Sequence, residues 1–402
     1  MKPPRLSRRV ASLAPSSTAA VARKAKALTA QGVDVVDLGL GEPDFSTPGF
    51  VGRAGVAAIE SGRTKYTDVA GEPELRDAIA EKYRREHGIP ISRENVLVTA
   101  GAKQAVYNAC QVLFETGDEV GLFCPYWVSF PEMIRLSGAV PLLVPTELET
   151  GWKPMAADLA DRATERTRGV VLNSPNNPTG AVVDPPELDA IVEWCASQDA
   201  CLIFDETYDR FLYDGRPHVS GARLWPEHSD RIVITGAASK TWAMTGWRLG
   251  WAIASREIVN AMASYQSHST SNASSISQRA ALAALSDPVR TDEVVAEMLA
   301  EYARRRDVMI AGLSAVPGIR CLPPEGAFYA FADVSELYPP REVTGSADFC
   351  ERLLADTGVA AVPGDAFGAD DCVRFSFATS LESIEEGLRR IASWVAAPVR
   401  SR

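Results

Sequence analysis

The chain has 402 residues, of which 46% are hydrophobic and 23% are charged. This composition is typical of a globular protein and excludes a disordered or fibrous one. The net charge is -11, so the chain as a whole repels a phosphate backbone or an anionic membrane, and neither nucleic acid nor a membrane is an expected partner. At roughly 150 residues per domain, the length predicts two to three domains.

Residue types that form disulfides or bind metals are dispersed along the chain. The seven cysteines show no Cys-x-x-Cys spacing, so we expect reduced residues of the core. The four histidines are far apart in the sequence, and no metal is expected. Arg23, Lys24 and Lys26 interrupt the segment after the N-terminus, and no run of about 18 apolar residues occurs, so the sequence predicts a soluble cytoplasmic protein.

The first strand candidate is the apolar segment 35–38. From residue 95 to residue 254, short apolar runs alternate with longer segments of helical period, which is typical of βα units and a mostly parallel sheet. The strands predicted in this region are 96–98, 119–123, 140–144, 170–172, 201–204 and 232–234. Their near-continuous hydrophobicity predicts burial on both faces. The helices predicted here are 103–114, 188–197 and 259–285, the last with a Ser-rich interruption at 267–275.

The pattern changes after about Pro288. A long amphipathic helix is predicted over 291–313, and short strands at 327–332, 359–362 and 373–377 alternate with helices. This mixture indicates a second, smaller α+β domain. We therefore predict an N-terminal arm that also forms part of the small domain (1–45), a large domain (46–290) and a small C-terminal domain (291–402).

The residues that follow each strand are the first candidates for chemistry, because ligands of open α/β sheets bind at the carboxyl ends of the strands. After the strand at 96–98, Gly101 makes a turn that opens a helix, a geometry suited to a phosphate group. Lys103 lies in the first turn of that helix, where a cation opposes the helix dipole unless an anion is near. A solvated lysine is the alternative.

Three further strands are followed by polar or aromatic side chains. Trp127 offers a flat aromatic face, although core packing would also explain it. Asn177 belongs to the cluster 173–180, which would otherwise be a simple turn. Asp205 directly follows an apolar strand, where burial of its carboxylate is costly without a cation or a proton donor.

The last of these strands is followed by a lysine and an arginine. Lys240 is flanked by small and apolar residues, and desolvation lowers the pKa of such an amine and makes it a nucleophile. Arg248 follows in the same segment and would bind a phosphate. A lysine amine, a buried acid, an aromatic plate and a phosphate site are the set that pyridoxal 5'-phosphate requires.

Three motifs carry a family resemblance. They are the segment 239–248 (SKTWAMTGWR), the segment 174–180 (SPNNPTG) and the segment 41–45 (GEPDF). With them, the chain resembles the fold-type I pyridoxal-phosphate aminotransferases, and most of all their bacterial aspartate aminotransferase branch, from about Leu6 to the last helix. The resemblance implies an α/β fold: a large domain with a mostly parallel seven-stranded sheet flanked by helices, plus a smaller α+β domain. It also implies a homodimer whose active sites are shared between subunits.

The resemblance assigns catalytic roles to Lys240, Asp205 and Tyr208. Lys240 would form the Schiff base with the cofactor and act as general acid and base, Asp205 would pair with the pyridinium nitrogen, and Tyr208 would hydrogen-bond the ring oxygen. The full set of cofactor-binding residues implied is Gly101, Ala102, Lys103, Trp127, Asn177, Asp205, Tyr208, Ser239, Lys240, Arg248 and, from the neighbouring subunit, Tyr66.

The resemblance also implies a substrate site. Arg374 would bind the substrate α-carboxylate, and Lys103 would contact the distal carboxylate of an acidic substrate. The residues assigned to substrate are Gly41, Lys103, Trp127, Asn177 and Arg374. Two positions depart from the family pattern: Ala237 replaces a serine that contacts the phosphate, and Ala14 replaces a basic residue near the substrate side chain.

The predicted activity is transamination between an L-amino acid, aspartate or glutamate, and a 2-oxo acid, 2-oxoglutarate or oxaloacetate. Three alternatives stay open at this point. The same fold and cofactor could act on aromatic amino acids or prephenate, or could catalyse another reaction such as β-elimination. The third is a cofactor-binding regulatory module without turnover. Two features argue against it: the chain shows no basic helix-turn-helix segment, and its catalytic set is complete.

Overall fold

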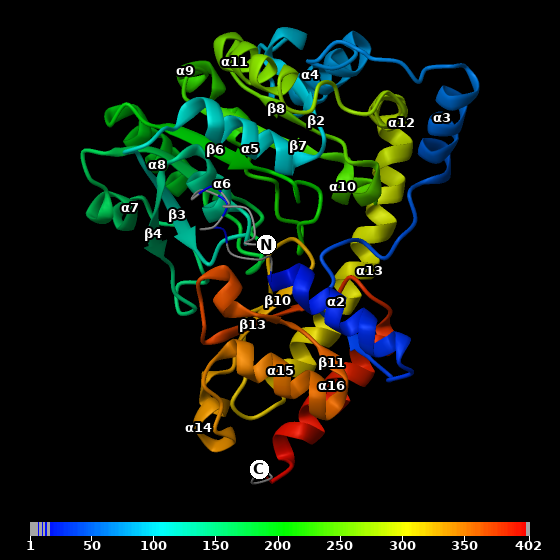
Figure 1. The fold of residues 1–402 in the computed structure, drawn as a ribbon, viewed down its shortest axis with the longest axis vertical. Coiled ribbons are helices and arrows are strands. Elements are labelled where there is room, and N and C mark those ends of the chain that lie inside the picture. The colour runs from blue at the N-terminus through cyan, green and yellow to red at the C-terminus, as the bar shows by residue number, and fades with distance from the viewer. Residues whose placement is uncertain (1–6, 8–9, 11–12, 14–16, 399–402) are drawn as a thin grey trace, which may run out of the picture.

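The computed structural model describes residues 7, 10, 13 and 17–398. Its larger part, here called the large lobe, contains a seven-stranded sheet in the order β2-β8-β7-β6-β5-β3-β4 (Figure 1). The strands are β2 (Val96–Thr99), β3 (Glu119–Cys124), β4 (Val140–Pro145), β5 (Thr167–Asn173), β6 (Cys201–Asp205), β7 (Ile232–Ala237) and β8 (Gly250–Ile253). Only β8 runs antiparallel to its neighbours, so the predicted mostly parallel sheet is confirmed.

Helices cover both faces of this sheet. One face packs against α5 (Ala102–Leu113), α6 (Phe130–Ser137) and α11 (Arg256–Ser267). The other face packs against α3 (Gly49–Glu60), α4 (Pro73–His87), α7 (Ala156–Arg162), α8 (Pro185–Ser197) and α12 (Ser275–Ser286). Along β6, Leu202 and Phe204 belong to one core and Ile203 to the other, because side chains alternate along a strand. Short helical turns complete the lobe: η1 (Arg93–Asn95), η2 (Gly221–Leu224), α9 (Trp225–His228), α10 (Ala238–Thr241) and η3 (Thr245–Trp247).

The sheet differs from the sequence prediction at its two ends. The strand β8 was missed because its sequence, Gly-Trp-Ala-Ile, has a single β-branched residue and follows directly on the motif at 239–248. The prediction of strands buried on both faces is wrong for β4, where Val140 and Leu143 are exposed. The reason is that β4 is the edge of the sheet and pairs with β3 alone. The Ser-rich interruption between α11 and α12 is confirmed.

The small lobe lies below the sheet in Figure 1 and is joined to it by the long helix α13 (Pro288–Ser314). It contains a four-stranded antiparallel sheet in the order β12-β13-β10-β9 and a pair of parallel strands, β1 with β11. Its strands are β1 (Val36–Asp37), β9 (Arg320–Cys321), β10 (Tyr329–Asp333), β11 (Val359–Ala360), β12 (Val362–Pro363) and β13 (Cys372–Ser376). Its other elements are α2 (Ser17–Ala30), η4 (Ser335–Leu337), α14 (Tyr338–Arg341), α15 (Ser346–Thr357), η5 (Gly364–Phe367) and α16 (Leu381–Ala396).

The N-terminal segment belongs to the small lobe by its contacts. The strand β1 lies beside β11, near the other end of the chain, and α2 packs against β11 and β12. The segment then crosses from β1 toward the large lobe, where α3 begins at Gly49. The exact domain boundaries at 45 and 290 stay a prediction. Helix α13 starts at Pro288 and runs without a break through the second of them.

Candidate active site

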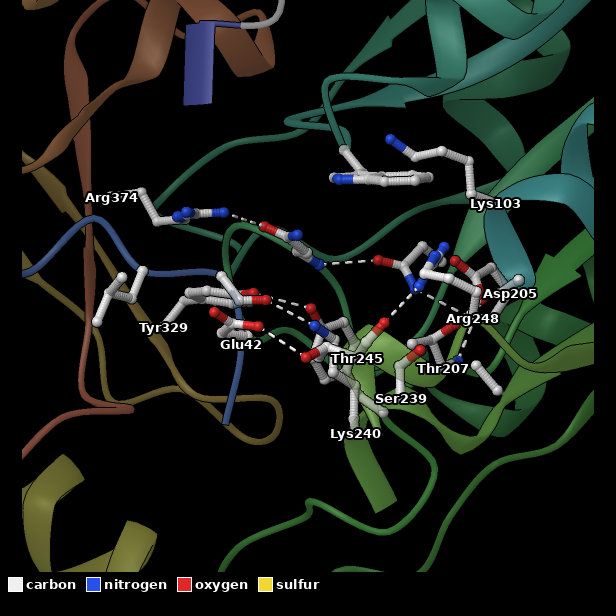
Figure 2. A pocket seen from close by; sticks show the side chains of 18 of the residues that line it. Glu42, Lys103, Asp205, Thr207, Ser239, Lys240, Thr245, Arg248, Tyr329 and Arg374 are labelled. Carbon is white, nitrogen blue, oxygen red and sulfur yellow. Dashed lines mark hydrogen bonds between the residues drawn. The ribbon is translucent and has the colours of Figure 1, made fainter. Parts of the chain in front are cut away.

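A cavity of about 480 Å³ lies where the carboxyl ends of the parallel strands meet the small lobe. Segments from both lobes line it, which Figure 2 shows from close by. The lining residues are Gly39, Leu40, Gly41, Glu42, Ala102, Lys103, Trp127, Asn173, Asn177, Asp205, Thr207, Tyr208, Ala237, Ser239, Lys240, Thr245, Arg248, Tyr329 and Arg374. Ligands of open α/β sheets bind at the carboxyl ends of the strands, so this cavity is the expected binding site.

Lys240 projects into the cavity from α10, the short helix that directly follows β7. Its Nζ donates a hydrogen bond to the Gly41 carbonyl oxygen at 2.6 Å and lies 5.6 Å from the centre of the Phe328 ring. Burial lowers the pKa of the Lys240 amine to about 8, and the carboxylate of Glu42 opposes this shift. Because a neutral amine is a nucleophile and a base, Lys240 is suited to covalent and proton-transfer chemistry near neutral pH.

Asp205 occupies the last position of β6 and is only 5% exposed. Its Oδ1 accepts hydrogen bonds from the Thr207 backbone N–H (3.1 Å) and hydroxyl (2.6 Å), and from the Thr235 hydroxyl (3.2 Å). Burial nevertheless raises the pKa of the carboxyl to about 6. Burial destabilises the ionised form of this carboxyl, so the side chain is suited to bind a cationic N–H group inside the cavity.

Asn173, at the end of β5, connects Asp205 to the neighbouring turn. Its side-chain amide donates to the Asp205 carbonyl oxygen at 2.9 Å, and its Oδ1 accepts from the Asn177 backbone N–H at 2.8 Å. This pair of bonds fixes the turn 173–180 against β6. The side chain of Asn177 is thereby directed to the cavity, where its Oδ1 meets Arg374.

The N-terminus of α5 and Arg248 form a cationic corner. Gly101 precedes the helix with φ of +86°, and a Cβ there would lie 2.7 Å from Nη2 of Arg248. Arg248 donates to the carbonyl oxygens of Thr245 (2.8 Å) and Ala100 (3.3 Å). Burial and the neighbouring Arg248 lower the pKa of Lys103 in the first turn of α5. Free backbone N–H groups and two cations make this corner an anion site.

Arg374 reaches the cavity from β13 of the small lobe and is 2% exposed. Its Nη1 donates to Asn177 Oδ1 at 2.9 Å and its Nη2 to the Gly39 carbonyl oxygen at 3.0 Å, while Nε has no hydrogen-bond partner among the described residues. The guanidinium lies 4.3 Å from the centre of the Tyr329 ring. A guanidinium that lines a cavity fits a carboxylate bound there.

Lys103 lies on the other side of the cavity from Arg374 (Figure 2). Its Nζ is 4.8 Å from the centre of the Trp127 ring, a cation–π contact. Trp127 in turn packs edge to face on Phe130, with ring centres 5.2 Å apart. The cavity thus has a cation at each end and an aromatic wall.

Comparison with known proteins decides the class. The family model "Aminotransferase class I and II" matches residues 33–391. The chain belongs to the class I and II aminotransferases. The aspartate aminotransferase of Geobacillus stearothermophilus is 42% identical, over 98% of this chain and 99% of that protein. The aspartate/prephenate aminotransferase of Thermus thermophilus is 45% identical, over 96% and 98%.

A solved structure agrees with these relatives. The structure of the aspartate aminotransferase from Thermus thermophilus with maleate matches this chain with a TM-score of 0.92 at 44% identity. The match covers 97% of this chain and 99% of that one. A second, from Rhizobium meliloti, has the same TM-score at 38% identity. The predicted fold, the enzyme class and the family resemblance are confirmed.

The structure brings most of the predicted site residues of this aminotransferase together. Those that line the cavity are Gly41, Ala102, Lys103, Trp127, Asn177, Asp205, Tyr208, Ser239, Lys240, Arg248 and Arg374. Gly101 borders it through its contact with Arg248. Tyr66 does not line it and is 90% exposed on the loop after α3. Of the two departures, Ala237 is buried in the lining, and Ala14 lies outside the described residues.

Sequence reasoning missed part of the lining. Glu42 and Thr245 stand inside the quoted motifs, and Thr207 follows Asp205 closely, so their positions in the chain gave a signal that was not used. Tyr329 gave none, because it comes from β10 of the small lobe and reaches the cavity only through the fold. Its hydroxyl shares a 2.9 Å hydrogen bond with that of Tyr208.

Three general features of the described part of the chain bear on its chemistry. No helix there is long and apolar enough to cross a membrane. No group of three or more His, Cys, Asp or Glu side chains in residues 17–398 is arranged to hold a metal ion. The seven cysteines are free thiols, and five of them are buried.

Proposed function

We propose that this aminotransferase transfers the amino group of aspartate or glutamate to a 2-oxo acid, 2-oxoglutarate or oxaloacetate, with pyridoxal 5'-phosphate as its cofactor. The observation that carries the proposal is the pair of cations Arg374 and Lys103 on two sides of one cavity, with Lys240 projecting into it (Figure 2). Two cations so placed match the two carboxylates of an acidic amino acid.

The residues around the cavity fit the cofactor at three points. Burial raises the pKa of the Asp205 carboxyl, and a protonated ring nitrogen beside it would stabilise the ionised form. Gly101 has no Cβ, which leaves space beside Arg248. This space lies at the N-terminus of α5, a position suited to a phosphate. Lys240 lines the same cavity, and burial lowers the pKa of its amine. The residues proposed to hold the cofactor are Gly101, Ala102, Lys103, Trp127, Asn177, Asp205, Tyr208, Ser239, Lys240 and Arg248, with Tyr66 of the partner subunit.

When bound, pyridoxal phosphate supplies a ring that withdraws electrons from the substrate and makes its α-proton acidic. The protein supplies the proton transfer and the orientation. Lys240 Nζ removes the proton from the substrate α-carbon and, in the second half-reaction, returns one to the 2-oxo acid that is being aminated. Asp205 would hold the proton on the ring nitrogen of the cofactor, and Trp127 would pack against its ring.

Arg374 orients the substrate. Its guanidinium binds the α-carboxylate, and Asn177 holds the guanidinium in position. Lys103 reads the distal carboxylate from the opposite wall. The names of the relatives, which include aspartate aminotransferases and a structure with maleate, a dicarboxylate, support this division of roles.

A second candidate is the amino acid formed from prephenate, or an aromatic amino acid. Two observations favour it: several relatives are named aspartate/prephenate aminotransferases, and Trp127 forms an aromatic wall beside Lys103. The carboxylate on the ring of the prephenate-derived amino acid would bind Lys103 in the place of the distal carboxylate of aspartate.

The test is a single-turnover experiment with purified protein loaded with pyridoxal phosphate. Aspartate, glutamate, phenylalanine and the prephenate-derived amino acid are added separately, and the change in cofactor absorbance is followed. We expect aspartate or glutamate to react fastest. Reaction with only another donor would refute the substrate assignment, and release of pyruvate and ammonia from a β-substituted amino acid without any 2-oxo acid would identify a lyase instead.

The proposed assembly is a homodimer with shared sites, located in the cytoplasm. The homodimer is supported by exposed apolar side chains: Val56 and Ile59 on α3 are each more than half exposed, and Tyr66 follows them. Such residues are expected to be covered by a second copy. Sedimentation of the protein at micromolar concentration should give the mass of a dimer, and a monomer there would contradict the shared site.

A further inference from the structure

A short segment of the N-terminal region, here called the strap (residues 39–47), crosses from β1 of the small lobe to the cavity of the large lobe. It is fastened near both ends. Thr47 donates through its hydroxyl to the Ala243 carbonyl oxygen at 2.8 Å. The carbonyl oxygen of Gly39 accepts from Arg374 at 3.0 Å. The strap therefore holds a fixed course along the cavity wall.

Glu42 lies in the middle of the strap and lines the cavity. Its Oε2 accepts a 2.7 Å hydrogen bond from the hydroxyl of Thr245, and Figure 2 shows the two side chains beside Lys240. The residue before it, Gly41, accepts the hydrogen bond from Lys240 Nζ. Two neighbouring strap residues thus bind the same stretch of the large lobe, one at the lysine and one at Thr245.

Two carboxylates and two guanidinium groups act on Lys240. The groups that act on it are the carboxylates of Glu42 and Asp205 and the guanidinium groups of Arg248 and Arg374, and the ring of Tyr208 lies 5.9 Å from its Nζ. Asp205 already accepts three hydrogen bonds and faces the cofactor side of the cavity. Glu42 has the largest opposing effect on the lowered pKa of Lys240.

We propose that Glu42 is a positioning residue for Lys240: its carboxylate, held in place by Thr245, is the counter-charge to the ammonium form of the lysine side chain. The inference rests on the proposed function, in which Lys240 removes and returns the α-proton. Burial and two nearby guanidinium groups all favour the neutral amine, and a base that is too weak holds the transferred proton poorly. The charge of Glu42 keeps the amine basic enough for that task.

Two substitutions separate the charge from the hydrogen bond. Glu42→Gln removes the charge and keeps an acceptor for Thr245, whereas Thr245→Val removes the hydroxyl and keeps the charge. Glu165→Gln is the matched control, because it also removes one carboxylate but lies at an exposed position before the amino end of β5, away from the cavity. All three changes are made in the full chain.

The measurement is the pH dependence of Lys240 labelling by an amine-reactive reagent in the cofactor-free protein, read by mass spectrometry of the peptide. In Glu42→Gln we expect the midpoint to fall by about 0.5 to 1 pH unit at ~10 mM salt, and the difference to shrink at ~0.5 M salt because mobile ions screen an exposed charge. Glu165→Gln should keep the midpoint of the parent protein. A midpoint in Glu42→Gln within about 0.2 unit of the parent overturns the proposal.

The Thr245→Val variant decides between charge and hydrogen bond. A shift smaller than that of Glu42→Gln supports the charge as the cause. An equal shift also supports it, because Thr245 holds the carboxylate in place. A larger shift assigns the effect to the hydrogen bond itself and overturns the proposal. Borohydride reduction of the cofactor-loaded protein, followed by peptide mapping, tests separately whether Lys240 carries the cofactor. If another residue is marked, the proposed function fails, while the labelling midpoints still decide the role of Glu42.

Discussion

The buried acid of the site yields a prediction about stability that does not require turnover. Burial raises the pKa of Asp205 from 3.8 to about 6 in the folded protein, so folding disfavours its ionised form. Each pKa unit corresponds to about 1.4 kcal/mol, and the shift of about two units therefore costs roughly 3 kcal/mol of folding free energy wherever the group is ionised. The cost is fully present above pH 6 and disappears as the pH falls through about 4.

The perturbation is Asp205→Asn in the cofactor-free protein. Asn keeps an acceptor for Thr207 and Thr235 but has no charge to desolvate, so the variant should be more stable than the parent at pH 8 by up to ~3 kcal/mol and nearly equal to it at pH 4. The assay is denaturant or thermal unfolding of both proteins across this pH range. Asp158→Asn, an exposed change on α7, is the control and should show no such pH dependence.

The result that would refute the reasoning is a difference between Asp205→Asn and the parent that is the same at pH 4 and pH 8. It would mean that the protein does not penalise the ionised carboxylate. Adding pyridoxal phosphate should reverse the order of stability at pH 8, because the parent then gains a cationic partner that the variant binds poorly.

Four further substitutions test the site. Lys240→Ala should abolish transamination, and a variant with near-full activity would contradict its assignment. Arg374→Lys should lower kcat/KM about 100-fold, roughly 3 kcal/mol, because an ammonium cannot replace the guanidinium fork; an unchanged value would remove Arg374 from the substrate site. Lys103→Met should raise KM about tenfold more for aspartate than for phenylalanine, and equal increases would mean that Lys103 does not read the distal group. Gly101→Ala should weaken cofactor binding, measured by equilibrium titration, since its Cβ would meet Arg248 at 2.7 Å; tight binding would show that the corner relaxes.

The elements of the large lobe that could be predicted are those whose signal is local. The runs 201–204 and 232–234 are continuous and apolar because their strands lie in the middle of the sheet. The same rule fails for β4, since a position at the sheet edge is set by strand order and not by composition. The strand β8 has the same length as β2, but its sequence, Gly-Trp-Ala-Ile, has a single β-branched residue, whereas β2 has Val96, Val98 and Thr99.

The site divides in the same way. Lys240 and Asp205 follow strands directly, so their place at the sheet edge was accessible from the chain order. The convergence of Arg374 with them required the family resemblance, because nothing local in β13 tells which cavity its side chain enters. Tyr329 and the partnership of Glu42 with Thr245 depend on how the small lobe meets the large one, and no sequence pattern encodes that contact.

The helix α13 restricts how the molecule can be divided into pieces. Its 27 residues extend for about 40 Å, with the Thr291 hydroxyl donating to the Ala284 carbonyl oxygen of α12 and Leu313 in the core of the small lobe. Proteases cleave exposed loops, so limited proteolysis should not release the two lobes as intact fragments along this connection. A fragment that began at residue 291 would lack the first turn of the helix and the Asp287 side chain that caps it. Expression of either lobe by itself would therefore need a start or end point outside α13.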